Sequence, residues 1–269
     1  MLKFIGVFVA VCLALSAQAA DDTLLFGVNE GTSGTAGFAD RQEKYQPFAD
    51  YIGKTLKKKV KLESASDLKN LVRSLNAARY DMVLIRPSHI SAAAMRDQNY
   101  SLLAAAKGDS IAYFIVHKDS PLKSKADLQG KRIVMPDEIA YPTKIGLAML
   151  RDLGNPTSDI RIFRSQEAVG YAIEQKLSDV GVVISYSKVW KDWEKNGHRA
   201  LWQSEKLPYW SIVVSPKIKP ADVEKIRAAL VALDTTDEGK KILEKIGIKG
   251  FMPGNQQAYL DMLAWIEKK

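Results

Sequence analysis

The chain has 269 residues, of which 46 % are hydrophobic and 26 % are charged, and a formal net charge of +8. This length allows one large hydrophobic core or two modest ones. The basic residues are dispersed, with short clusters such as those at 57–59 and 240–241, whereas nucleic-acid-binding proteins gather them beside stacking aromatics. We therefore expect no nucleic acid partner, and a solvated surface with a mild attraction for anions.

The N-terminus has the pattern of a secretory signal peptide, which we assign to residues 1–19. Lys3 gives a positive start, an apolar stretch follows at 4–15, and Ala17-Gln18-Ala19 forms a small-x-small cleavage site. The apolar stretch is too short for a membrane-spanning helix. A buried N-terminal helix is the less favoured alternative.

The single cysteine, Cys12, lies inside the apolar stretch of this signal. Val11 precedes it, where a lipoprotein signal has a small residue, so we expect no lipidation. The mature chain then has no thiol and no disulfide. Export without cysteines favours a bacterial periplasm over a disulfide-stapled secreted domain.

The first half of the mature chain alternates strands and helices. A strand at 23–28 ends in a polar loop from Asn29 to Asp40, at the place where open α/β sheets bind ligands. The pattern then predicts an amphipathic helix, a strand, a helix capped by Ser66, a strand buried on both faces and a further helix, at 42–56, 60–63, 67–78, 81–85 and 90–96. This alternation indicates a parallel sheet.

The same alternation begins again after an apolar strand at 112–117. Strands are predicted at 132–135, 159–163 and 180–184, and helices at 143–153, 167–176 and 187–194. A strand at 210–214 leads back, and three helices follow at 222–233, 238–246 and 255–268. We therefore expect an α/β fold of two Rossmann-like lobes joined by a two-strand hinge. Lobe 1 comprises 20–111 with 212–269, and lobe 2 comprises 112–211.

Motifs of enzymatic chemistry are absent from the sequence. The three histidines are widely spaced, and there is no HExxH, CxxC, GxSxG, P-loop or GxGxxG motif. The adjacent acids Asp137 and Glu138 could act as a base or metal ligand, but we favour the polar start of a helix. Serine and tyrosine residues near the loops lack a base to activate them. We expect no enzyme, no cofactor and no metal.

Four polar segments follow strands or begin helices, where the fold would bring them to one cleft. They lie at 86–89, 140–143, 164–166 and 185–186. Helix N-termini present free N–H groups and a positive dipole to an anion. Arg86 and Arg164 could add bidentate donors. Ordinary helix capping explains each segment taken singly, but the four together favour a cleft.

The segment IVHKDSPLKSKADLQGKRIVM at 115–135 reads as a strand, a turn, a short helix and a second strand. It closely resembles the lobe-crossing segment of the periplasmic phosphate-, phosphite- and phosphonate-binding proteins (PhnD-like). The resemblance continues through KYQPFAD, YDMVLIRPSHIS, QEAVGYAIEQKLSDV and PYWSIVVS, at 44–50, 80–91, 166–180 and 208–215, and through the tail at 225–251. It implies a monomeric type II periplasmic binding protein that closes on a small anionic ligand and delivers it to the permease of an ABC importer.

The ligand positions that the resemblance implies depart from the family pattern. Ala140-Tyr141-Pro142 stands where a Ser-Thr-Ser run is common, and Pro142 has no N–H for an anion. Gln166 occupies the position where the family has a histidine that contacts the oxyanion, and Arg86 occupies a position where the family usually has a glycine. In the family, acidic residues hold the amine of an aminophosphonate. The matching positions in this chain lie near Tyr186 and Trp210, where the acids are replaced by aromatic residues. The expected ligand-binding residues are Tyr45, Arg86, Ser88, His89, Tyr141, Thr143, Arg164, Ser165, Gln166, Ser185, Tyr186 and Trp210.

Three functions remain open at this point. The first is an importer binding protein for a small oxyanion such as phosphate or a phosphonate. The second is a periplasmic receptor that presents its ligand-bound form to a membrane sensor kinase or chemoreceptor. An enzyme on the same scaffold is the least favoured, because no nucleophile–base pair is visible.

Overall fold

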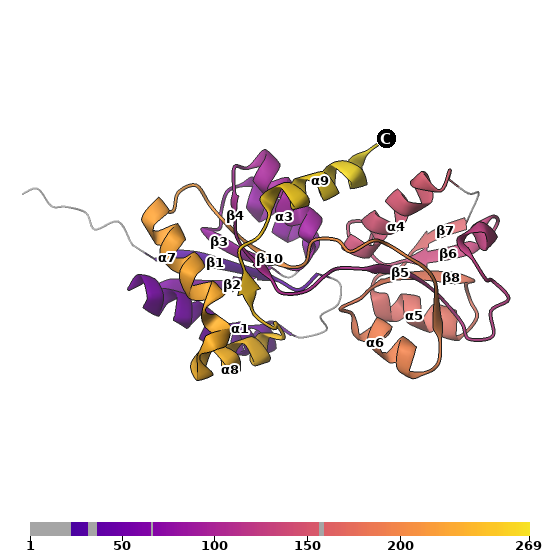
Figure 1. Cartoon of the computed structure of the whole chain (residues 1–269), viewed down its shortest axis with the longest axis horizontal. Coiled ribbons are helices and arrows are strands. Elements are labelled where there is room, and N and C mark those ends of the chain that lie inside the picture. The colour runs from indigo at the N-terminus through magenta and orange to yellow at the C-terminus, as the bar shows by residue number, and fades with distance from the viewer. Residues whose placement is uncertain (1–22, 32–36, 66, 156–158) are drawn as a thin grey trace, which may run out of the picture.

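The computed structural model describes residues 23–31, 37–65, 67–155 and 159–269. The expected signal peptide at 1–19 and the expected helix cap Ser66 lie outside the described residues. Figure 1 shows two sheets placed side by side, each with helices on its faces. Within the described ranges, no helix combines the length and hydropathy that crossing a membrane requires.

The first sheet has the strand order β11-β4-β10-β3-β1-β2. Strand β1 pairs in parallel with β2 and β3, whereas β10 runs antiparallel to both β3 and β4. The strand bounds are β1 Leu24–Asn29, β2 Val60–Ser64, β3 Met82–Ile85, β4 Ser101–Ala106, β10 Ser211–Val214 and β11 Phe251–Met252. Every residue of β3 and β10 is buried, as a strand covered on both faces requires.

Helices cover both faces of the first sheet. Helices α1, α7 and α8 pack on one face, and α2 and α3 pack on the other. Their bounds are α1 Phe38–Leu56, α2 Leu68–Asn76, α3 Ser88–Asp97, α7 Pro220–Val231 and α8 Asp237–Ile246, with a short 3-10 turn at Leu233–Thr235.

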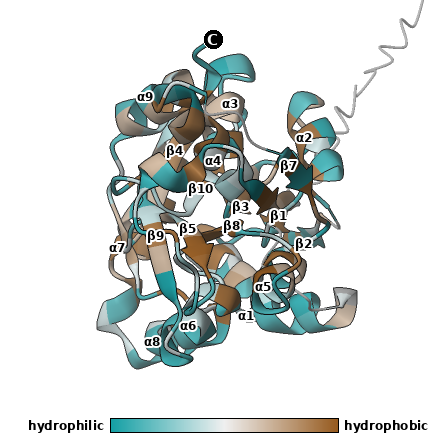
Figure 2. Cartoon of the chain, turned by 90° about the vertical axis from the view of Figure 1, so that its right-hand side faces the viewer, coloured by the Kyte–Doolittle hydropathy of each residue, from teal (hydrophilic) through white to brown (hydrophobic). Residues whose placement is uncertain are grey.

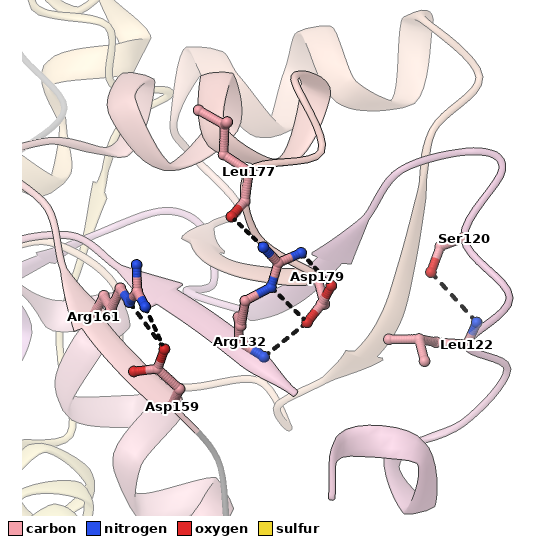
Figure 3. A network of polar contacts seen from close by, with 7 residues as sticks. All are labelled: Ser120, Leu122, Arg132, Asp159, Arg161, Leu177 and Asp179. Atoms are coloured by element: carbon pink, nitrogen blue, oxygen red, sulfur yellow. Dashed lines mark hydrogen bonds and ion pairs between the residues drawn. The ribbon is translucent and has the colours of Figure 1, made fainter. Parts of the chain in front are cut away.

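The second sheet has the strand order β7-β6-β8-β5-β9. Its strands are β5 Ala112–Val116, β6 Arg132–Met135, β7 Asp159–Ile162, β8 Val180–Ile184 and β9 Arg199–Gln203. Helix α4 (Tyr141–Asp152) covers one face, and α5 (Gln166–Glu174) and α6 (Lys188–Lys195) cover the other. A 3-10 turn at Lys125–Leu128 is capped by Ser124, whose hydroxyl accepts from Ala126 N. Figure 3 shows how Arg132 on β6 bonds both Asp179 and the Leu177 carbonyl, which fixes the start of β8.

The two strands that we expected to cross between the lobes lie each within a single sheet, so this prediction was wrong. Strand β5 pairs with β8 and β9, and β10 pairs with β3 and β4. The chain passes between the sheets at 107–111 and 204–210. These two segments are joined by the bridge between Ser110 and Leu207, whose backbones exchange hydrogen bonds of 3.0 and 2.9 Å.

The C-terminal helix α9 (Gln256–Glu267) packs on α3 beside the first sheet and on α4 beside the second. Its indole Trp265 Nε1 donates to Asp152 at 2.6 Å, and Arg151 donates to the Lys268 carbonyl at 2.6 Å. Arg96 on α3 forms an ion pair with Glu267. The end of the chain therefore contacts elements of both sheets.

Several element boundaries also differ from the sequence prediction. Helix α2 is capped by Asp67, whose carboxylate accepts from Asn70 N at 2.7 Å. Asp137 and Glu138 form a turn before α4 and not its first turn, because the Ala140 N–H bonds back to the Asp137 carbonyl. Strands β4, β9 and β11 were not predicted.

Candidate functional site

A buried ion pair joins the ends of two neighbouring strands in the first sheet. Asn29 of β1 lies beside Ile85 of β3, so the residues that follow them, Glu30 and Arg86, meet at the carboxyl edge of the sheet. Arg86 Nη2 donates to Glu30 Oε1 at 3.0 Å. The two residues are only 9 % and 6 % exposed, respectively. A charge at this position has lost most of its contact with water.

Two residues of helix α1 also donate to the Glu30 carboxylate. Lys44 Nζ and the Tyr45 hydroxyl donate to the same oxygen, Oε1, at 2.7 and 2.8 Å. Burial alone would raise the pKa of Glu30, but the positive charges of Arg86 and Lys44 and the hydrogen bonds outweigh it and lower the pKa. Burial raises the pKa of Tyr45, which stays a neutral donor. The cluster of Glu30, Lys44, Tyr45 and Arg86 therefore holds two cations and one anion.

Aromatic side chains cover the other face of Arg86. Its guanidinium carbon lies 4.1 Å from the ring centroid of Trp210. Tyr209 stacks on the same indole at 4.7 Å, and Tyr186 meets it edge-on at 5.2 Å. Tyr186 follows β8 of the second sheet, so the two sheets meet at this ring. Burial raises the pKa of Tyr186, and raises that of Tyr209 to about 12, so both hydroxyls stay neutral.

A second set of contacts joins the starts of helices α3 and α4. The Ser88 hydroxyl lies within hydrogen-bonding distance of the Tyr209 and Pro208 carbonyls, at 2.8 and 2.9 Å, and the Tyr141 hydroxyl donates to Pro208 at 3.3 Å. The ring of His89 stacks on Tyr141, with 5.3 Å between centroids. These contacts connect both helices to the segment that passes between the sheets.

His89 is a neutral imidazole in this arrangement. Its Nε2 lies 3.1 Å from the Ile139 carbonyl, which can only accept, so Nε2 carries the proton. Burial, with a smaller effect of the Lys144 charge, lowers the pKa of His89 to about 3. Its Nδ1 is buried without a hydrogen-bond partner.

The helices that follow these strand ends differ in whether a side chain caps their first turn. Helices α5 and α6 are capped by the hydroxyls of Ser165 and Ser187, which accept from Ala168 N and Trp190 N at 3.3 and 3.1 Å. Helices α3 and α4 have no side-chain cap. Their first-turn N–H groups and positive dipole ends are suited to bind an anion, although Pro142 leaves α4 with one donor fewer.

The sequence matches the model of a protein family over residues 39–259, and that family is described as the periplasmic substrate-binding protein of phosphonate ABC transporters. The chain belongs to this family. No curated protein matches it.

Solved structures show the fold of this family member. XAC2383 from Xanthomonas citri, bound to chloride ion, is 17 % identical with a TM-score of 0.77, over 92 % of this chain and 98 % of that chain. PhnD1 from Prochlorococcus marinus, in complex with methylphosphonate, is 15 % identical with a TM-score of 0.72, over 91 % and 98 %. A binding protein component of a phosphonate transporter from Pseudomonas aeruginosa is 15 % identical with a TM-score of 0.68, over 91 % and 86 %. The type II periplasmic binding fold predicted from sequence is thereby confirmed.

Seven of the twelve predicted site residues of this phosphonate-binding family member come together around these contacts. They are Tyr45, Arg86, Ser88, His89, Tyr141, Tyr186 and Trp210. Ser185 lies next to Tyr186, with its hydroxyl oxygen accepting from Ile111 N at 3.1 Å.

The other four predicted residues make local contacts in the second lobe. Thr143 donates to the Pro136 carbonyl at 2.8 Å, and Gln166 Oε1 accepts from Ile184 N at 2.9 Å. Ser165 caps α5, and Arg164 is exposed. Direct ligand contact by any of the twelve residues stays a prediction.

Sequence reasoning missed Glu30, Lys44 and Tyr209. The signal for Glu30 was present, because the polar loop after the first strand begins at Asn29 and was placed at a ligand-binding edge. The pairing of Glu30 with Arg86 joins residues 56 positions apart and depends on β1 and β3 being neighbours. Tyr209 was quoted in the family segment, but its stacking on Trp210 has no periodic pattern in the sequence.

Proposed function

We propose that this phosphonate-family binding protein captures a small oxyanion, phosphate or a phosphonate, between its two lobes and delivers it to the permease of an ABC importer. The observation that carries the proposal is the position of Arg86, a buried guanidinium where the carboxyl edge of the first sheet meets Tyr186 of the second. Guanidinium groups bind phosphate oxygens through two parallel hydrogen bonds.

The charges around Arg86 support an anionic ligand. Lys44 and Arg86 give the Glu30 cluster one positive charge in excess, and a phosphonate can compete with the Glu30 carboxylate for both cations. Tyr45 donates to that carboxylate through a neutral hydroxyl, which can turn to a ligand oxygen. The uncapped starts of α3 and α4 add backbone donors on both sides.

The chain organisation fits this use. In the proposal, lobe 1 comprises 20–111 with 212–269 and lobe 2 comprises 112–211, and the lobes close about the segments at 107–111 and 204–210. A signal peptide at 1–19 brings the mature protein to the periplasm, where it acts as a monomer. Closure on a ligand between two lobes is the usual motion of periplasmic binding proteins.

Calorimetric titration of the purified mature protein with phosphate, phosphite and methylphosphonate tests the proposal, with sodium chloride and sodium acetate as matched anions. We expect one-to-one binding of at least one phosphorus oxyanion, tighter than either control. A bound ligand at a hundredfold excess over its Kd should also stabilise the protein by about 2.7 kcal/mol in thermal unfolding. Equal or absent binding of all five anions would overturn the oxyanion assignment.

A further inference from the structure

A cavity of about 400 Å³ is lined in part by His89 and by none of the residues of the Glu30 cluster. Helix α3 forms its floor, and α2, α9 and the start of α4 form its walls. Figure 2 shows α3 between α2 and α9, and both of these helices contact α3 directly. We name this cavity the α3 groove. Its volume is within the range of pockets that hold small organic molecules.

The α3 groove has an apolar interior and a polar rim. The apolar residues that line it are Val72, Leu75, Ile90, Ala93, Ala94, Ile139 and Leu263. The polar residues are Lys69, Asn76, His89, Lys144 and Glu267. Such a lining suits a ligand with an aliphatic part and one polar group, because only the latter can replace the hydrogen bonds of water.

The charges on the rim do not cancel. Glu267 forms an ion pair with Arg96, and Lys69 lies 3.9 Å from Glu138. Lys144 makes no ion pair within the described part of the chain, and this half-buried residue lies close enough to His89 for its charge to act on the ring. An unbalanced positive charge therefore remains at the α4 end of the groove.

His89 lines the groove at the same end and is 8 % exposed. Its Nδ1 has no hydrogen-bond partner among the described residues, but it carries no proton and can only accept. The other nitrogen is committed to Ile139, which fixes the ring where α3 meets the segment before α4. A carboxylate in the groove would therefore be held by the charge of Lys144 and not by this ring.

We propose that the α3 groove is a second binding site, which takes an aliphatic monocarboxylate. The carboxylate lies at Lys144 and the alkyl chain lies between α2, α3 and α9. The occupant contacts α2 and α3 of the first lobe and Ile139 of the second. Its binding therefore depends on how the two lobes are placed relative to each other. This site does not depend on which ligand occupies the Arg86 site.

Calorimetric titration with sodium octanoate, below its micelle concentration, tests the proposal directly. We expect saturable one-to-one binding, with octylammonium chloride not binding. Hexanoate should bind about fifteenfold more weakly, since each buried CH2 group changes affinity about fourfold. Binding of octylammonium as tightly as octanoate, or equal binding of hexanoate and octanoate, would overturn it.

Three variants place the binding in the groove. Ala93→Phe fills the interior of the groove and should lower the affinity for octanoate at least about tenfold. Lys144→Gln removes the positive charge but keeps a side chain of similar size, and it should lower the affinity for octanoate about threefold. The control Lys195→Gln, on α6, should leave affinity unchanged. Unchanged affinity in a folded Lys144→Gln protein would overturn the proposal, even where Ala93→Phe fails to fold.

Octanoate binding should persist in Arg86→Ala, which separates this proposal from the oxyanion site. Loss of octanoate binding in that variant would place the carboxylate in the Arg86 site and would overturn the proposal that the α3 groove binds it. Loss of phosphonate binding alone would leave the groove proposal supported and concern only the proposed function.

Discussion

The guanidinium carbon of Arg86 lies 4.1 Å from the ring centroid of Trp210, while Nη2 of the same group donates to Glu30. A planar cation can use its face for an aromatic ring and its edge for a carboxylate at once, which lysine cannot. Tyr186 of the second lobe meets the same indole. The orientation of Arg86 is thus set by both lobes.

Arg86→Ala should weaken the binding of the tightest oxyanion by about tenfold to a hundredfold. This corresponds to the roughly 1.5–3 kcal/mol of a hydrogen bond to a charged group. Calorimetry measures the loss, and Arg164→Ala, on the exposed turn before α5, serves as the matched control. A loss in the Arg164 variant with none in the Arg86 variant would move the site to the start of α5 in the second lobe.

Glu30→Gln should have opposite effects on stability and on anion affinity. The ligand-free protein loses about 3–5 kcal/mol of its free energy of unfolding, because Arg86 is left buried without its counter-charge. The oxyanion no longer competes with a carboxylate, so its affinity rises. Denaturant unfolding and calorimetry measure the two quantities.

The control for this variant is Glu63→Gln, which removes the exposed ion pair with Arg79. An exposed pair contributes about 0–1 kcal/mol, so this change should be nearly neutral. Weaker oxyanion binding in Glu30→Gln would show that the carboxylate helps to hold the ligand and does not compete with it.

His89 should make the protein less stable in mild acid. Its pKa in the folded protein is about 3, below the ordinary value of 6.5, so the unfolded chain binds the extra proton. The stabilisation is therefore complete above pH 6.5 and is lost as the pH falls towards 3. This single group should cost about 2 kcal/mol of unfolding free energy between pH 7 and pH 5.

Denaturant unfolding at pH 7 and pH 5 measures this loss. His89→Gln keeps a donor for the Ile139 carbonyl but cannot be protonated, so its loss over the same interval should be about 2 kcal/mol smaller. An equal loss in both proteins would assign the acid sensitivity to other groups.

The fold was predictable where local pattern and burial agree. The run Met82 to Ile85 is apolar throughout, and β3 is indeed the strand between β1 and β10. Strand β9 has no fully buried residue, and β11 has two residues, so neither produces a hydrophobic pattern. Sheet membership depends on long-range pairing, so the sequence pattern alone does not show that β5 and β10 each lie within one sheet and do not cross between the lobes.

The candidate site was predictable only in part, for the same reason. The residues at strand ends and helix starts were visible, and Arg86 was expected to face the cleft because it follows a buried strand. The partner of each residue was not visible. Gln166 and Thr143 looked like ligand contacts in sequence, but each bonds a backbone group of its own lobe.

The lobes should close about the segments at 107–111 and 204–210 when ligand binds. The Ser110–Leu207 bridge is the backbone pairing between these segments, so rotation about it moves one sheet against the other. X-ray scattering should show a smaller radius of gyration with saturating oxyanion than without. Arg86→Ala at the same anion concentration should keep the larger radius. An unchanged radius in the wild type with a tightly bound ligand would contradict hinge closure.

The last prediction concerns the choice among phosphonates. The Glu30 carboxylate of this site is already bound by Arg86 and Lys44, and Tyr186 and Trp210 stand near where an ammonium would need acids. Burying an unpaired ammonium costs several kcal/mol, and cation–π contact returns only about 0.5–2 kcal/mol. We therefore expect the site to reject aminoalkyl phosphonates and to accept smaller or more apolar anions.

Calorimetry with 2-aminoethylphosphonate and propylphosphonate isolates the charge, because a methyl group replaces the ammonium at nearly the same size. Propylphosphonate should bind at least about tenfold more tightly, which is a difference of about 1.4 kcal/mol. Methylphosphonate and phosphate serve as the smaller references. Tighter binding of the amino compound than of all three would mean that a carboxylate is released to pair with the ammonium. Glu30 would then be the residue to test, since Glu30→Gln should remove that preference while leaving propylphosphonate bound.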